Sequence, residues 1–159
     1  MSRERAHAHL KKYNLEDRIQ EFEVSSATVE LAAQAVGVEP ARIAKTLSYL
    51  VDGCAILIVA AGDIRVDNRK FKDTFHTKAK MLTAEQASEM IGHAVGGVCP
   101  FGVNEGVKVY LDESMKRFDV VYPAAGTSSS AVRLTIPELE LASEFTAWVD
   151  VAKLPEENV

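Results

Sequence analysis

The chain has 159 residues, of which 47% are apolar and 26% are charged, and its formal net charge is −5. This length predicts a single domain over residues 1–159, which can bury a core without a disulfide or a structural metal. The acidic charge argues against a general nucleic-acid coat protein, and we expect no DNA partner. An acidic protein can still hold the end of an RNA, because that needs only a few local cations.

The cysteines and the N-terminal residues indicate a cytoplasmic protein. Cys54 and Cys99 form no CxxC motif, and the histidines show no metal-ligand spacing, so we expect neither a metal nor a cofactor. Residues 1–14 carry four Lys and Arg with no apolar stretch after them, unlike a secretory signal. The longest apolar run, residues 54–61, is too short to span a bilayer, so we expect no membrane partner.

In chain order, the first predicted elements are a helix over residues 2–13, a strand over 19–24, a helix over 28–36 and a short helix from Pro40. Ser25, Ser26 or Thr28 could cap the second helix, and Gly37 suits its C-terminal end. Two strands follow, over 43–51 and 54–61, and Asp52-Gly53 predicts a hairpin turn between them. The second strand is apolar on both faces and should be central.

The remaining predicted elements are helices over 68–75 and 84–91, strands over 107–111, 120–122 and 131–136, and a short helix from Pro137. Thr83 to Gln86 has the pattern of a capping box, and Gly92 suits the end of that helix. Strands and helices are interleaved. The predicted fold class is therefore α+β, with a mixed, partly barrel-like β-sheet surrounded by helices.

Lys45 is the most informative residue. Side chains alternate along a strand, so Lys45 should share a face with Ile43, Leu47, Tyr49 and Val51. A cation on an apolar face is costly unless a charged or strongly hydrogen-bonding group meets it. Its ammonium group therefore either escapes to water along the sheet or serves a site.

Two segments rich in small residues, 96–102 and 123–130, could bring backbone groups close to a ligand. The alternatives are a structural turn for the first and a flexible connection for the second. Cys99 could be a nucleophile with His93 as its base, but nearness in sequence does not establish such a dyad, and a buried structural thiol is the favoured interpretation. The cations between Arg65 and Lys80 form either a solvated helix face or an RNA contact.

These pieces resemble a known family. The segments 28–33 (TVELAA), 37–38 (GV) and 43–47 (IAKTL) are similar to the first signature of the YbaK-type aminoacyl-tRNA deacylases, a domain also found as the editing domain of bacterial prolyl-tRNA synthetases. Residues 61–63 and 66–67 follow in the expected place. Residues 92–93 and 96–102 resemble the family's glycine loop, and residues 109–114 and 124–126 complete the pattern.

The resemblance implies a mixed, partly barrel-like sheet and a trans-editing hydrolase, a carboxylic ester hydrolase that deacylates mischarged tRNA such as Cys- or Ala-tRNA(Pro). It implies that the acceptor end of the tRNA, and a synthetase, are partners. The alternative is a non-catalytic module that binds a tRNA end, a nucleotide or a synthetase. Lys45 matches the family's essential lysine and Gly96 the first glycine of its loop, so both are expected to be catalytic. The expected substrate-binding residues are Thr28, Gly97, Cys99, Pro100, Gly102, Ala124, Ala125 and Gly126.

Three of these positions depart from the family. Cys99 stands where a serine is usual, Ala124 replaces a serine of the cysteine-specific branch, and Thr28 replaces an aromatic residue of that branch. The departures bear on the amino acid that is recognised more than on the reaction. Our mechanistic hypothesis is that water attacks the ester, that Lys45 has an electrostatic or positioning role, and that the backbone of Gly96 and Gly97 orients the carbonyl. The alternatives are Lys45 as a general base with a lowered pKa, second, and Cys99 as a nucleophile, third.

Overall fold

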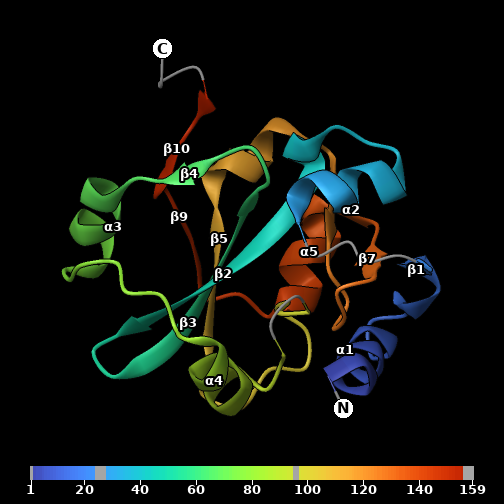
Figure 1. Ribbon diagram of the computed structural model, residues 1–159, viewed down its shortest axis with the longest axis horizontal. Coiled ribbons are helices and arrows are strands. Elements are labelled where there is room, and N and C mark those ends of the chain that lie inside the picture. The colour runs from blue at the N-terminus through green and yellow to red at the C-terminus, as the bar shows by residue number, and fades with distance from the viewer. Residues whose placement is uncertain (1, 24–27, 95–96, 156–159) are drawn as a thin grey trace.

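The computed structural model describes residues 2–23, 28–94 and 97–155. Its fold is mixed α+β, in which a curled six-stranded half-barrel sheet is surrounded by helices (Figure 1), as predicted. None of the helices within the described ranges is long and apolar enough to cross a membrane.

The main sheet has the strand order β8-β6-β2-β3-β5-β9. Its strands are β2 (Ile43–Val51), β3 (Cys54–Ala61), β5 (Lys108–Asp112), β6 (Val120–Pro123), β8 (Leu134–Thr135) and β9 (Ala147–Val149). The β2–β3 and β6–β8 pairs are antiparallel, and the other three pairs are parallel. Two small antiparallel pairs join β1 (Ile19–Glu21) to β7 (Ser130–Val132) and β4 (Arg65–Val66) to β10 (Ala152–Lys153).

Strand β3 is central, as its apolar sequence predicts. Residues 55–61 are all buried, because β2 and β5 flank the strand and packed side chains cover both faces. On one face Leu57 and Val59 join the main core; on the other, Ile58 joins a smaller cluster with Tyr49 and Phe71. The Tyr49 and Phe71 rings lie 4.8 Å apart between centroids, which suits aromatic packing.

The α-helices are α1 (Ser2–Lys11), α2 (Val29–Val36), α3 (Asn68–Phe75), α4 (Ala84–Gln86) and α5 (Ile136–Ser143). Short 3₁₀ turns cover Glu16–Arg18, Pro40–Arg42 and Glu113–Arg117. The hydroxyl of Thr28 caps α2 by accepting from the Leu31 N–H at 3.1 Å, and Gly37 ends the helix with φ +86°. The alternative caps Ser25 and Ser26 lie outside the described residues.

Two predicted elements differ from the structure. The helix over 84–91 begins at the predicted Thr83–Gln86 capping box, but its second half, Ala87–Ile91, winds as a π-helix. The strand over 131–136 is divided at Arg133, because β7 pairs with β1 whereas β8 pairs with β6. The short strands β4, β9 and β10 were not predicted, since two or three residues are too few to show alternation.

Candidate functional site

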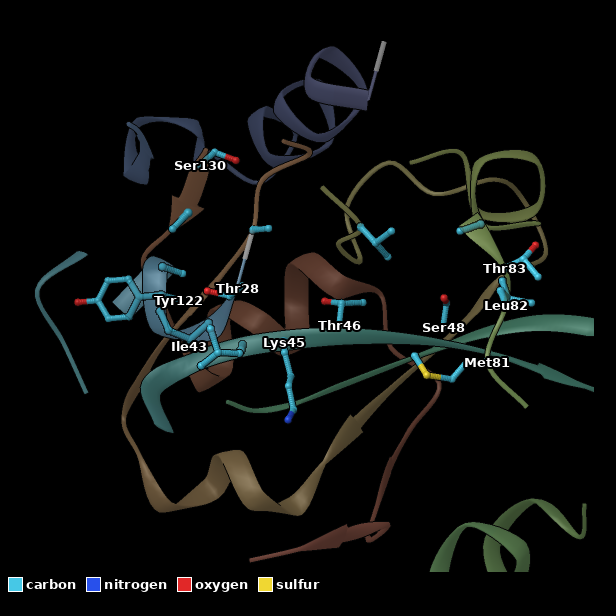
Figure 2. A pocket seen from close by; sticks show the side chains of 17 residues that line it. Thr28, Ile43, Lys45, Thr46, Ser48, Met81, Leu82, Thr83, Tyr122 and Ser130 are labelled. Atoms are coloured by element: carbon cyan, nitrogen blue, oxygen red, sulfur yellow. The ribbon is translucent and has the colours of Figure 1, made fainter. Parts of the chain in front are cut away.

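A cavity of about 350 Å³ lies along one edge of β2, between α2, β6, β7 and residues 81–83. Its wall consists mainly of small and hydroxyl-bearing residues (Figure 2): Thr28, Val29, Ala32, Ile43, Ala44, Lys45, Thr46, Ser48, Met81, Leu82, Thr83, Ala87, Val98, Tyr122, Ala124, Ser130 and Ala131. Lys45 is the one charged residue among the described residues that line it.

The cavity arises from a gap in the sheet. Strand β6 pairs with β2 only at Ile43 and Ala44, at the beginning of β2. Towards the other end, the chain around Met81 adds to the same edge through a bridge with Tyr49. The edge of β2 between these two contacts, around Thr46, faces the cavity instead of a neighbouring strand.

Lys45 leaves β2 on the face opposite to Thr46 and Ser48, as the alternation predicts (Figure 2). Its Nζ atom donates to the carbonyl oxygens of Gly62 at 3.5 Å and of Ile64 at 2.5 Å. The ammonium group is thus half-buried, and within the described parts of the chain it bonds to these two neutral acceptors and forms no ion pair. Burial lowers the pKa of Lys45 below its ordinary value, against the opposing effect of the Asp63 and Glu30 carboxylates.

The turn that receives Lys45 is held tightly. A Cβ atom at Gly62 would lie 2.2 Å from the Pro40 carbonyl oxygen and 2.9 Å from that of Ile43, so only glycine fits. The next residue, Asp63, accepts two hydrogen bonds from the Arg117 guanidinium group, at 2.6 and 3.1 Å. The carbonyl groups that hold Lys45 are therefore fixed from both sides.

The two small-residue loops predicted from the sequence meet in the structure. A Cβ atom at Gly97 would lie 2.4 Å from the carbonyl oxygen of Gly126 and 2.8 Å from the backbone nitrogen of Thr127, so the absence of a side chain permits this contact. Helix α1 covers the other side of both loops, since a Cβ at Gly102 would meet the Arg5 carbonyl and one at Gly126 that of Ser2. Gly96 lies outside the described residues.

Cys99 belongs to the glycine loop and its side chain is fully buried, and burial raises the pKa of its thiol to about 12. His93 lies close by, with Nε2 3.7 Å from the Cys99 sulfur. However, His93 Nε2 is 2.7 Å from the Phe101 carbonyl oxygen, which can only accept, so this nitrogen carries the proton. The imidazole Nδ1 then accepts from the Ser2 hydroxyl at 2.6 Å. This arrangement describes a structural thiol, because His93 has no free nitrogen to take its proton.

The structure gathers some of the predicted site residues and separates others. Thr28, Lys45 and Ala124 line the cavity. Gly97, Cys99, Pro100, Gly102, Ala125 and Gly126 do not, and their role in substrate binding stays a prediction. Pro100 and Gly102 instead line a second cavity, of about 430 Å³, against α1.

Sequence reasoning missed several polar lining residues, namely Thr46, Ser48, Thr83 and Tyr122, whereas Ser130 belongs to the segment 123–130 that was considered for a ligand contact. For Thr46 and Ser48 a signal was present, since they are the polar residues on the face of β2 opposite to Lys45. The others come from distant segments. Within the described ranges, no group of three His, Cys, Asp or Glu side chains is placed to hold a metal ion.

Comparison with known proteins agrees with this fold. The family model described as "Aminoacyl-tRNA editing domain" matches residues 23–141. An uncharacterised Bacillus subtilis protein, YwhH, is 49% identical over 154 residues, which cover 96% of this chain and 98% of YwhH. The proline–tRNA ligase of Lysinibacillus sphaericus is 31% identical over 90 residues, 56% of this chain but only 16% of that enzyme.

A solved structure described as a "putative trans-editing enzyme for prolyl tRNA synthetase" superimposes with a TM-score of 0.86 at 30% identity, covering 96% of this chain and 97% of that one. A second, the hypothetical protein APE2540, has a TM-score of 0.78 at 23% identity over 91% of this chain and 99% of its own, and supports the fold alone. By sequence and by fold, the chain belongs to the aminoacyl-tRNA editing domain family.

Proposed function

We propose that this protein is a trans-acting deacylase that hydrolyses the ester of a small amino acid, such as alanine or cysteine, mischarged on proline tRNA. Family membership and the similarity to a trans-editing structure support a deacylase role. The observation that carries the proposal is the cavity beside β2, whose lining includes Thr28, Ala124 and Lys45 at positions that match the family signatures, with the Lys45 ammonium group held on the face of β2 opposite to Thr46.

The dimensions of the cavity suit this substrate. Its volume of about 350 Å³ lies at the low end of ligand sites, and alanine side chains form much of the wall. A synthetase pocket cannot reject a smaller amino acid strongly, because a missing methylene is worth only about 1–3 kcal/mol. A second site that is small and hydrolytic supplies the missing discrimination.

The chemistry follows from the lining. No described residue of the wall carries a carboxylate or an imidazole that could serve as a general base. In the proposed reaction, water attacks the ester carbonyl with help from a ribose hydroxyl of the substrate, the acyl C–O bond breaks, and the amino acid and the tRNA 3′ end leave. The Gly97 N–H already donates to the Ala94 carbonyl at 3.0 Å, so in this proposal the glycine-loop group that would orient the carbonyl is the backbone of Gly96.

Lys45 acts in this proposal as a fixed cation. Two neutral carbonyls hold its ammonium group without cancelling the charge. The ammonium group lies on the face of β2 that Lys45 shares with Ile43, opposite to Thr46. We therefore propose that it contacts the terminal nucleotide or the ester region of the substrate rather than the amino-acid side chain. Lys45 as a general base ranks second, and the burial of Cys99 leaves a nucleophilic thiol third.

The test is single-turnover deacylation of a panel of mischarged tRNAs by the wild type and by Lys45→Ala and Lys45→Met. Both variants should lose about 100- to 1000-fold in rate, the usual effect of removing one group that stabilises the transition-state charge. Lys11→Ala, which alters an exposed lysine of α1, is the matched control and should retain the wild-type rate. Thermal melts show whether each variant is folded.

Full activity of a folded Lys45→Ala protein would contradict the assignment of Lys45. If the wild type hydrolyses no member of the panel, nor free aminoacyl esters, but binds an aminoacylated acceptor end, the non-catalytic binding module replaces the deacylase.

A further inference from the structure

The register of strand β2 shows which of its backbone N–H and C=O groups bond to β3 and which face the opposite edge. Because the turn Asp52-Gly53 has two residues, Val51 and Cys54 form the first pair of the hairpin, and the two residues of this pair exchange hydrogen bonds. Hydrogen-bonded pairs alternate along an antiparallel ladder, so the odd-numbered residues of β2 bond to β3 and the even-numbered ones face away. Two hydrogen bonds agree with this assignment: the Leu50 N–H donates to the Lys80 carbonyl at 2.8 Å, and the Ser48 carbonyl accepts from the Leu82 N–H at 3.1 Å.

Thr46 is the even-numbered residue between these contacts and the pairing of Ala44 with Pro123. Its backbone N–H and C=O therefore point into the gap, and within the described ranges no backbone group pairs with them there. Its side-chain hydroxyl oxygen is buried and also has no hydrogen-bond partner among the described residues. Unpaired polar groups are rare in folded proteins and call for a ligand or water.

From this gap we infer that Thr46 binds the aminoacyl group of the substrate through its backbone, as a one-residue antiparallel bridge. In a hydrogen-bonded antiparallel pair, one residue exchanges both its N–H and its C=O with one opposite residue. An α-aminoacyl ester carries the same two groups on one residue. The Thr46 N–H would donate to the ester carbonyl oxygen, and the Thr46 C=O would accept from the α-amino group.

The bridge defines a ligand class, esters of α-amino acids, and rests on the proposed function. The gap is short, since the Ala44 position pairs with Pro123 on one side and the Ser48 C=O already accepts from Leu82 on the other. Among the described residues, the Ser48 N–H beside Thr46 also lacks a backbone partner on this edge. A peptidyl chain would extend into the paired positions and should bind more weakly than a single aminoacyl group. The Thr46 N–H would also stabilise the negative charge that develops on the carbonyl oxygen during hydrolysis.

Thr46→Pro tests the donor. Proline deletes the N–H that faces the gap but no hydrogen bond to β3, so an edge position of this kind can accept it. We expect kcat/KM to fall about 10- to 150-fold, as for a hydrogen bond to a charged group. Thr46→Val keeps the backbone groups and reports the loss of the hydroxyl alone. If the proline variant does not fold, the α-hydroxy analogue of threonine at position 46 removes the same N–H and keeps the side chain.

The wild type tests the acceptor without any substitution. Alanyl and propionyl esters on the same tRNA differ only in the α-amino group, which also activates an ester towards uncatalysed hydrolysis. After each rate is divided by the uncatalysed rate of the same ester, the propionyl ester should react about 10- to 150-fold more slowly. N-acetylalanyl-tRNA should be slow as well. Equal normalised rates for the alanyl and propionyl esters, or wild-type kinetics in a folded Thr46→Pro protein, would overturn the bridge while leaving the deacylase in place.

Calorimetry with non-hydrolysable amide-linked alanyl- and propionyl-adenosine separates the two proposals. Preferential binding of the alanyl analogue with no hydrolysis of any ester would retain the bridge and overturn the deacylase. Equal binding of the two analogues would overturn the bridge whatever the hydrolysis assay shows.

Discussion

Cys99 should make the stability of this protein fall in alkaline solution. Its thiol has a pKa of about 12 in the folded protein, raised by burial from 9.0. Because the folded pKa is the higher one, the contribution to stability is complete below about pH 9 and is lost as the pH rises towards 12. At about 1.4 kcal/mol per pKa unit, the free energy of unfolding should drop by about 1 kcal/mol between pH 8 and pH 10 from this group alone.

The assay is urea unfolding at about pH 8 and about pH 10 for the wild type, Cys99→Ala and Cys54→Ala. Tyr13 and Tyr49, whose pKa values are also raised, titrate equally in all three proteins, so the difference between proteins isolates Cys99. Cys99→Ala should lose about 1 kcal/mol less than the wild type over this range, and Cys54→Ala, which alters an exposed thiol, should follow the wild type.

Equal pH dependence in the wild type and Cys99→Ala would refute the burial argument. A thiol reagent that labels Cys99 as fast as Cys54 in the folded protein would refute it too. Cys99→Ser should also deacylate at a rate close to the wild type; loss of turnover, with an acyl thioester trapped on the wild-type protein, would restore the nucleophile hypothesis.

Two further predictions concern the surroundings of the site. Gly62→Ala should lower the free energy of unfolding by about 1–3 kcal/mol, because the new methyl group overpacks against Pro40. It should also lower the deacylation rate, because it displaces an acceptor of Lys45. Denaturant unfolding and deacylation kinetics measure the two effects, and unchanged values would refute the contact. Charge reversal at Arg69 and Lys72, both exposed, should weaken tRNA binding and flatten its salt dependence if this helix touches RNA, whereas an unchanged salt slope would leave a solvated face.

Lys70 is not suitable for the charge-reversal test of RNA binding. Its Nζ atom donates to the Ala152 carbonyl at 2.8 Å and pairs with Asp150 at 3.3 Å, so it anchors the strand next to β4. Its substitution would mix a change in RNA binding with a change in stability. In the sequence, Lys70 belongs to the same group of cations between Arg65 and Lys80, and only the fold shows that its ammonium group bonds within the protein.

The sequence by itself determined the elements whose signals are local. Turn chemistry at Asp52-Gly53, the capping box at Thr83 and the apolar run of β3 each lie within a few residues, and the structure has all three. Alternation along β2 placed Lys45 on the face opposite to Thr46, and the ordered signatures around it were sufficient for the family.

Only the tertiary structure decided what surrounds those residues. Cys99 and Ala124 both belong to motifs of the family, yet the Cys99 side chain is fully buried away from the cavity and Ala124 lines the cavity. The gap at Thr46 exists because β6 and the chain around Met81 stop short of each other on one edge of β2. Such pairings join segments tens of residues apart, and no local period records where a neighbouring strand ends.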